Sequence, residues 1–113
     1  MTRIARQIVR ELKRFASADQ RNVLIRFFKT GEGEYGYGDE FLGVKVPQTR
    51  LVVKQYWKEC DFVAARELLD SKYHEVRLSA LLILVKKYRW SEKHDLEQAG
   101  SPMLLSSLLQ ELD

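Results

Sequence analysis

Cysteine, proline and long apolar runs are scarce in this chain. Its 113 residues include one cysteine and two prolines. The single thiol of Cys60 excludes an internal disulfide, and one cysteine with two distant histidines does not form a zinc-binding motif. No apolar run reaches the ~18 residues of a transmembrane helix, and the N-terminus lacks the apolar core of a signal peptide. We therefore expect a cytoplasmic protein with no metal site and no membrane partner.

Glycine is also scarce, except in one segment. Five of the six glycines and one of the prolines lie in residues 31–47, together with Tyr35, Tyr37 and Phe41. A disordered tether rarely contains such bulky apolar residues, so we expect a shaped surface loop. The aromatic rings either stack on a base or sugar edge or pin the loop against helices, and pinning is the preferred interpretation. The glycine spacing resembles a dinucleotide fingerprint, but it follows a predicted helix and is lined with acids, which excludes phosphate binding there.

Charge alternates along the chain in four blocks. Residues 1–30 have a net charge of +6, residues 31–42 of −4, residues 43–93 of +5 and residues 94–113 of −4, which sum to the formal charge of +3. The two basic blocks can attract phosphates without regard to sequence. Solvated helix faces explain the same pattern, and from charge alone this is the preferred interpretation.

Apolar periodicity predicts helices along the whole chain, and no strand alternation is present. Ile4, Ile8, Leu12 and Phe15 recur on one helical face. The second helix is expected to begin at a Ser17–Gln20 capping box and to bury Val23, Leu24, Phe27 and Phe28. Pro47 suits a first turn, Asp61 and Ser91 are predicted caps of further helices, and residues 72–74 are a predicted connector. The predicted helices span residues 3–16, 17–29, 47–57, 61–69, 75–89, 91–100 and 102–112.

The last of these predicted helices has a broad apolar surface. Residues 102–112 include five leucines and one methionine. Such a surface must fold back onto the core or pair with another molecule. We favour pairing, which predicts a homo-oligomer that forms through residues 102–112.

Two stretches resemble one known family. Gly31-x-Gly33-Glu34-Tyr35-Gly36-x-Gly38-Asp39-x-Phe41-Leu42-Gly43-Val44-Lys45-Val46-Pro47-x-x-Arg50 is similar to the N-terminal signature of the DNA alkylation repair family, the AlkD-type alkylpurine DNA glycosylases. Residues 74–88 resemble the family too, and the resemblance covers roughly residues 1–93. It implies an all-α fold, a right-handed stack of HEAT-like repeats with about six helices in one domain over residues 1–113, of which 94–113 depart from the family. The similar triplets 49–51 and 76–78 are a weak internal repeat.

The resemblance also implies a function. Members of the family excise positively charged alkylated purines without a metal or organic cofactor, using an aspartate in a Trp-Asp stretch. No position here matches it, because Asp95 follows His94 and Trp90 precedes Ser91. We therefore assign no catalytic residue. We expect a truncated or partial member that binds double-stranded DNA weakly and in a salt-sensitive manner, without excising bases alone. The alternative is a helical-repeat scaffold that self-associates through residues 102–112.

The candidate nucleic-acid-binding residues are bases in the predicted helices and loop. Lys45 either touches a phosphate or is a solvated loop lysine. Arg50 and Arg77 either reach phosphates or bond to acidic and carbonyl groups between repeats. For His74 a capping or packing role is preferred to acid–base chemistry, and Cys60 is expected to be unreactive beside Asp61. Lys54, Lys86, Lys87 and Arg89 are helix-surface bases, and for each alone a solvated charge is the preferred interpretation. The full candidate set is Lys45, Arg50, Lys54, Arg77, Lys86 and Lys87.

Overall fold

Helices dominate the part of the chain that the computed structural model describes, residues 1–28 and 38–99. Within these ranges no strand is present, apart from one isolated parallel bridge between Glu40 and Tyr73. The expected all-α class is confirmed. The HEAT-like stack remains a prediction, and the predicted helix 102–112 lies outside the described residues. The elements are α1 (Arg3–Arg14), α2 (Ala18–Phe28), α3 (Val46–Tyr56), α4 (Phe62–Leu69) and α5 (His74–Ala99).

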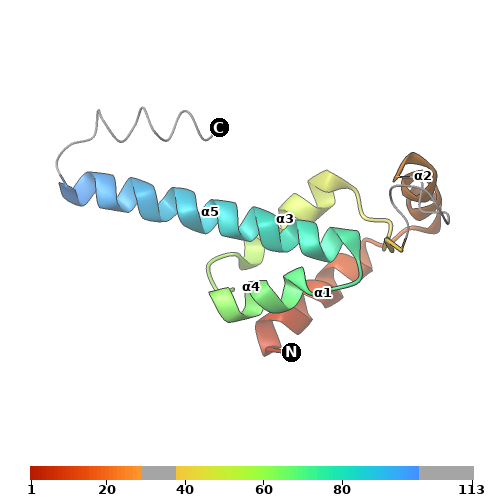
Figure 1. Ribbon diagram of the computed structural model, residues 1–113, viewed down its shortest axis with the longest axis horizontal. Helices are drawn as coiled ribbons and strands as arrows, with labels where there is room; N and C mark the ends of the chain where they lie inside the picture. The colour runs from red at the N-terminus through yellow and green to blue at the C-terminus, as the bar shows by residue number, and fades with distance from the viewer. Residues whose placement is uncertain (29–37, 100–113) are drawn as a thin grey trace.

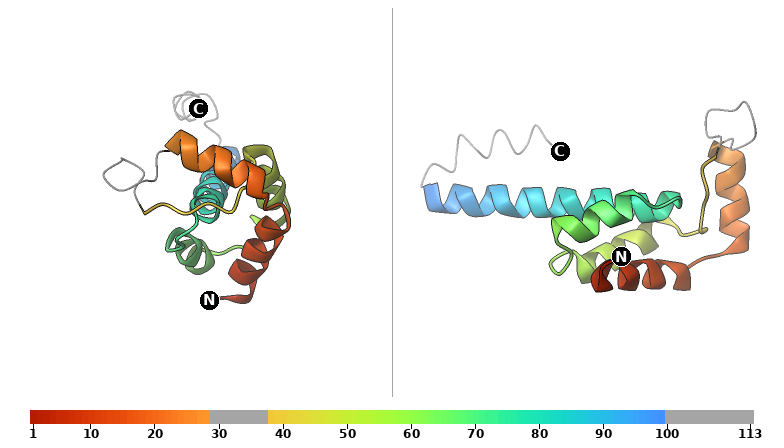
Figure 2. Two further views of the ribbon diagram at one scale, coloured as in Figure 1. Left: turned by 90° about the vertical axis from the view of Figure 1, so that its right-hand side faces the viewer. Right: turned by 60° about the horizontal axis from the view of Figure 1, so that its bottom comes forward.

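Four of the helices form a bundle. α1 and α5 lie on opposite sides, and each packs against both α3 and α4 (Figures 1 and 2). Only the first part of α5 joins the bundle, and its second half extends beyond the other helices (Figure 1). The bundle core is made mainly of aliphatic side chains, with one tyrosine and one cysteine: Ala5, Ile8, Leu12, Val44, Val52, Val53, Tyr56, Cys60, Ala64, Ala65, Leu68, Val76, Ala80 and Ile83.

α1 follows the predicted apolar spacing. Ile8 and Leu12 are fully buried on its inner face. The helix begins after Thr2, whose Oγ1 accepts a hydrogen bond from the Ala5 N–H at 3.3 Å. Glu67 of α4 then holds this end, because its carboxylate accepts the Thr2 N–H at 2.8 and 3.0 Å and lies 3.3 Å from the terminal ammonium of Met1. A carboxylate placed here also complements the positive end of the helix dipole.

A buried carboxylate shapes the loop before α3. Glu75, in the first turn of α5, is 2% exposed. Its oxygens accept backbone N–H bonds from Leu42, Gly43 and Val44 at 2.9, 2.8 and 3.0 Å. Gly43 has φ of +88°, and its carbonyl accepts the Ser17 N–H at 3.0 Å. The loop, the start of α2 and the start of α5 are therefore joined at one point.

The prediction that α2 buries its apolar side chains was wrong. No residue of α2 is buried, and Val23 and Phe27 are 51% and 71% exposed. The reason is geometric, since α2 projects from one end of the bundle (Figure 1). Its aromatic contacts lie at its C-terminal end, where the centre of the Phe28 ring is 5.1 Å from Phe27, 5.3 Å from Phe41 and 5.1 Å from His74.

Phe41 behaves as the pinning interpretation predicts. Its ring is 4% exposed and stacks on Phe28, so it fastens the end of the loop to α2. Tyr35 and Tyr37, for which the same role is predicted, lie outside the described residues.

The prediction of a new helix at Ser91 was also wrong, because α5 runs without interruption from His74 to Ala99. A serine satisfies the free N–H groups of a helix that starts, but it does not end the one before it. Glycine and proline are the residues that disfavour a helix interior most strongly, and neither occurs between residues 75 and 99. The predicted connector, residues 72–74, is one residue shorter in the structure, since His74 already belongs to α5.

Other caps match their predictions. Pro47 lies in the first turn of α3, where its missing N–H costs nothing. Asp61 precedes α4, and its carboxylate accepts the Ala64 N–H at 2.8 Å. Along residues 1–28 and 38–99, no helix combines the length and hydropathy that a bilayer crossing requires.

Candidate nucleic-acid interface

Three of the six predicted binding residues meet in one groove between α3 and α5. Arg50 and Lys54 lie one turn apart on α3, and Lys86 lies on α5. Arg89, one turn after Lys86, lines the same groove. The groove floor is aliphatic and consists of Val53, Leu82 and Val85.

The groove is strongly cationic. Arg50, Lys54, Lys86 and Arg89 are all exposed, and among the described residues no carboxylate lines the groove. The aliphatic floor supports the stems of the long basic side chains and leaves their charged ends at the surface. Fixed positive charge above an apolar floor is the arrangement that attracts a polyanion.

Lys87 belongs to a neighbouring groove on the other side of α5. That groove is lined by Trp57, Lys58, Phe62, Lys87, Trp90 and Ser91. The Nζ atoms of Lys58, Lys86 and Lys87 lie 5.8, 5.8 and 6.0 Å from the centre of the Trp57 ring. At these distances each ammonium is attracted to the ring face. Trp57 therefore lies where the cationic groove and this aromatic groove adjoin.

Lys45 and Arg77 lie away from both grooves. Lys45 is the exposed residue before α3, and its N–H donates to the Gln48 side chain at 2.9 Å. The Arg77 guanidinium pairs with the Asp39 carboxylate and donates to the Ser71 carbonyl at 2.9 Å. Arg77 thus makes the acidic and carbonyl contacts of its structural interpretation. A role for either residue in DNA binding remains a prediction.

His74 and Cys60 also have structural surroundings. His74 Nδ1 lies 3.5 Å from the Asp39 carboxylate, and its ring packs against Phe28 and Phe41. Cys60 is fully buried. Burial raises the pKa of the Cys60 thiol; Lys87 acts in the opposite direction, while Asp61 and Glu67 add to the increase. A raised pKa leaves little thiolate near neutrality, so the thiol is a poor nucleophile.

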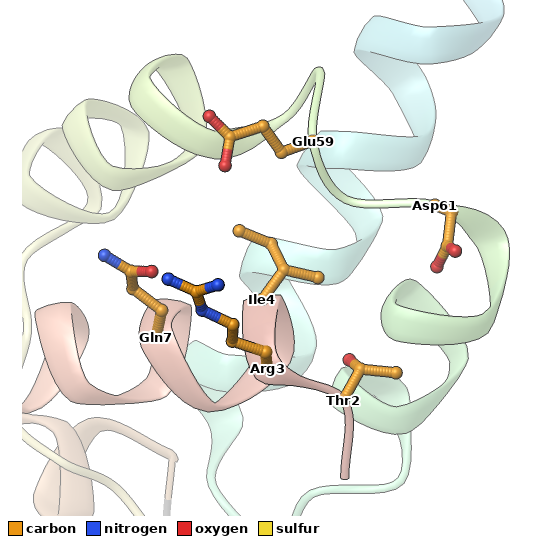
Figure 3. Close-up of a pocket in the computed structure, with 6 residues that line it drawn as sticks. All are labelled: Thr2, Arg3, Ile4, Gln7, Glu59 and Asp61. Carbon is orange, nitrogen blue, oxygen red and sulfur yellow. The ribbon is translucent and has the colours of Figure 1, made fainter.

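A pocket lined mostly by polar side chains lies between α1 and the turn that follows α3 (Figure 3). It is lined by Thr2, Arg3, Ile4, Gln7, Glu59 and Asp61, and Arg3, Gln7 and Glu59 point into it. Its Asp61 is already used as a helix cap, and Gln7 Nε2 donates to the Tyr56 hydroxyl at 3.3 Å. Neither here nor elsewhere in the described part of the chain do three or more metal-ligating side chains gather.

Four members of the basic surface were left out of the candidate set. Arg89 was interpreted as a solvated helix-surface base, although its spacing of three from Lys86 places both on one helical face. The outward arginines of α1, which are Arg3, Arg6 and Arg10, were counted only as part of the basic block 1–30 and as the polar side of an amphipathic helix.

Comparison with known proteins gives one finding. A family model described as DNA alkylation repair enzyme matches residues 8–103. The match therefore includes most of α1 and all of α2 to α5. It also extends past Lys93, where the resemblance described in the sequence analysis ends. Comparisons with curated proteins and with solved structures give no match.

Proposed function

The chain belongs to the DNA alkylation repair enzyme family, and from this premise we propose that it binds duplex DNA through phosphates in the groove between α3 and α5. The observation that supports this proposal is the convergence of Arg50, Lys54, Lys86 and Arg89 on that groove. Arginine offers a planar fork for two phosphate oxygens, and lysine offers a flexible point charge. The set suits a phosphate backbone, because each of its four side chains is a cation.

Binding of this kind is weak and sensitive to salt. Each phosphate that a base neutralises releases a counterion, so four contacts correspond to a slope of about −3.6 in a plot of log K against log salt. Such binding is independent of sequence. It serves to hold the protein on DNA, and it positions the duplex without identifying a lesion.

We further propose that this chain does not excise bases alone. Cleavage of the glycosidic bond of a charged purine needs a carboxylate close to the developing positive charge on the sugar. The groove offers basic and aliphatic side chains, and no residue of the sequence matches the aspartate that the family resemblance implies. Release of methylated purine by the purified chain would contradict this part of the proposal.

The experiment is fluorescence anisotropy with a labelled 20-base-pair duplex over a range of salt concentrations. Replacement of Lys54 and Lys86 by glutamine removes two charges from the groove, and we expect the salt slope to become shallower by about two. The matched control replaces Lys72 and Lys93 by glutamine. Both are exposed and line neither groove, so we expect the slope to stay nearly unchanged. Equal slopes for the two double variants would show that the groove is not the binding site.

A second candidate is a protein-interaction scaffold, which the aromatic groove favours. Phe62 and Trp90 are 72% and 56% exposed there, and clustered exposed aromatics are typical of docking surfaces. The occupant that fits is the segment 102–112 of a second copy, because its sequence combines leucines with an acidic residue and carries no base, opposite three lysines.

Light scattering separates the two candidates. The scaffold predicts an oligomer whose mass rises with protein concentration and that Trp90→Ser reduces to the monomer. The DNA-binding candidate predicts that W90S binds DNA as well as the unchanged chain does. A monomer at high concentration would contradict the scaffold.

A further inference from the structure

A second basic surface lies on α1, outside the groove. Arg3, Arg6 and Arg10 are exposed and line a shallow hollow with Gln7. Their spacing of three and four residues places them along one face of the helix. That face is opposite to the one that buries Ala5, Ile8 and Leu12, although Arg3 at its start points toward the pocket that Glu59 and Asp61 also line.

Two of the arginines are unfavourably placed for the stability of α1. The first turn of α1 contains no acidic residue and instead carries Arg3 and Arg6, next to the positive end of the helix dipole. The carboxylate that does lie at this end, Glu67, binds the Thr2 N–H and the terminal ammonium. A residue that is unfavourable for the local structure and makes no compensating contact is expected at functional positions.

Charge compensation is also missing along this face. Arg14, one turn after Arg10, pairs with Glu11 at 3.3 Å. Within the described part of the chain, no ion pair joins Arg3, Arg6 or Arg10 to a carboxylate. The carboxylates of Glu59 and Asp61 line the pocket beside Arg3 (Figure 3).

The length of the face suits a phosphate backbone. The seven steps from Arg3 to Arg10 rise by about 10 Å along the helix axis. One DNA strand advances 3.4 Å per phosphate along the duplex axis, so about three phosphates span this distance. Arginine is the side chain whose planar fork binds two phosphate oxygens at once. An acidic peptide offers no such regular spacing of charge, and we therefore favour the nucleic acid.

We propose that Arg3, Arg6 and Arg10 form a second binding site for the phosphates of duplex DNA, and that the chain bridges two duplex segments. α1 packs on α3, α4 and α5, and most of α5 lies on the other side of the bundle from it (Figure 2). The arginines lie on the face of α1 turned away from its buried residues, whereas the groove opens between α3 and α5, so the proposal gives each surface its own duplex segment. The bridging part of the proposal rests on the proposed function of the groove, whereas the arginine site does not.

The test measures capture of one duplex by another. A 20-base-pair duplex on beads, without label, is mixed with the full chain and with a fluorescent duplex of the same sequence in solution. The unchanged chain is expected to retain the fluorescent duplex. The variant R3Q/R6Q/R10Q is expected to retain at least tenfold less, and yet to bind a single duplex in anisotropy with the salt slope that the groove provides.

The control is R21Q/R26Q/R66Q, which removes three exposed charges from α2 and α4 and is expected to keep bridging. The melting temperature of both triple variants verifies that each is folded, and neither set includes a buried side chain. Undiminished capture by R3Q/R6Q/R10Q would overturn the inference, because bridging would then come from association of two copies.

The two proposals fail separately in this design. Suppose that the Lys54 and Lys86 double variant binds a single duplex as well as the unchanged chain does, while R3Q/R6Q/R10Q does not bind. In that case the groove is not a binding site and the arginine site remains. If R3Q/R6Q/R10Q matches R21Q/R26Q/R66Q in capture and in salt slope, the arginine site is wrong and the groove is unaffected.

Discussion

α1 and α2 are consecutive helices of 12 and 11 residues, and they differ completely in burial. α1 buries Ala5, Ile8 and Leu12, whereas α2 buries no residue. The difference does not come from apolar content, because α2 has five large apolar side chains, including Phe27 at 71% exposure. It comes from partners: α1 packs on three other helices, and α2 meets the described chain only at its ends.

Apolar periodicity therefore indicates which side of a helix can be buried, but it does not indicate whether a partner is present. The family match includes α2 as well as the bundle. A large exposed aromatic surface on a family element is the kind of surface that another segment or molecule covers. The predictions below test how strongly the two helices differ, starting with the largest expected effect.

Truncation of a buried side chain in α1 is expected to cost the most. Leu12 is fully buried, so Leu12→Ala removes apolar contacts and leaves a cavity, at a cost of about 2–5 kcal/mol in the free energy of unfolding. The matched change in α2 is Phe27→Ala, which removes a larger but exposed side chain and is expected to cost less than about 0.5 kcal/mol.

Urea unfolding of both variants measures this contrast. Equal losses of stability for L12A and F27A would mean that α2 is buried in solution by a partner that the described residues do not include. A loss below 1 kcal/mol for L12A would contradict the bundle core.

The junction between the two regions depends on a glycine. Gly43 has a left-handed φ of +88°, and a Cβ there would lie 2.0 Å from the Ser17 carbonyl oxygen. Gly43→Ala therefore combines backbone strain with a collision against backbone, and we expect a cost of about 2–3 kcal/mol. Gly38→Ala is the control, since φ is +84° there but no atom lies within 4 Å.

The difference between G43A and G38A isolates the collision. Hydrogen exchange is expected to show that G43A frees the amides of α2 more than those of α1, because Ser17 begins the contact between α2 and the loop. Similar exchange in the two helices would show that this contact does not hold α2.

Much of the bundle is predictable from sequence because its determinants are local. The spacing of Ile8 and Leu12, the cap at Asp61 and the proline at position 47 each act within one helical turn. The continuity of α5 through residue 91 depends on local sequence as well, because no glycine or proline interrupts it. The prediction instead gave more weight to Ser91 as the cap of a new helix.

The remaining features depend on contacts between distant residues. Glu75 binds the loop 31 to 33 residues earlier, and no spacing rule predicts that a glutamate in a first turn will be buried. Predicting the groove would have required knowing that Arg50 of α3 and Lys86 of α5 line the same surface. Sequence reasoning named both bases as candidate binding residues, but the pairing of the two helices follows only from the packing of the bundle.

Glu75 provides the next prediction. In Glu75→Gln, an NH₂ group replaces one oxygen and leaves a backbone N–H without an acceptor, at a cost of about 1–3 kcal/mol. The control is Glu40→Gln, which weakens an exposed pair with Lys72 at 3.7 Å and is expected to cost less than about 0.5 kcal/mol. Urea unfolding measures both, and a cost for E75Q no greater than that for E40Q would contradict the role of the buried carboxylate.

The smallest expected effect concerns the ends of the two helices and depends on pH. Partial desolvation acts to raise the pKa of Glu67, but hydrogen bonds from Thr2 and the charge of the terminal ammonium outweigh it, so the pKa is lowered. A lowered pKa in the folded state gives stability that is present above the ordinary carboxyl pKa of about 4.3 and is lost as pH falls through the folded value.

Glu67→Gln should therefore reduce the melting temperature slightly at pH 7 and not at pH 2, where the unchanged chain has lost the same contribution. Ser17→Ala removes the hydroxyl that accepts the Gln20 N–H at 3.3 Å before α2, and its effect should not vary over this range. If E67Q lowers the melting temperature by the same amount at both pH values, the charge of Glu67 does not hold α1, and the end of α1 is fixed by burial alone, as the inner face of that helix is.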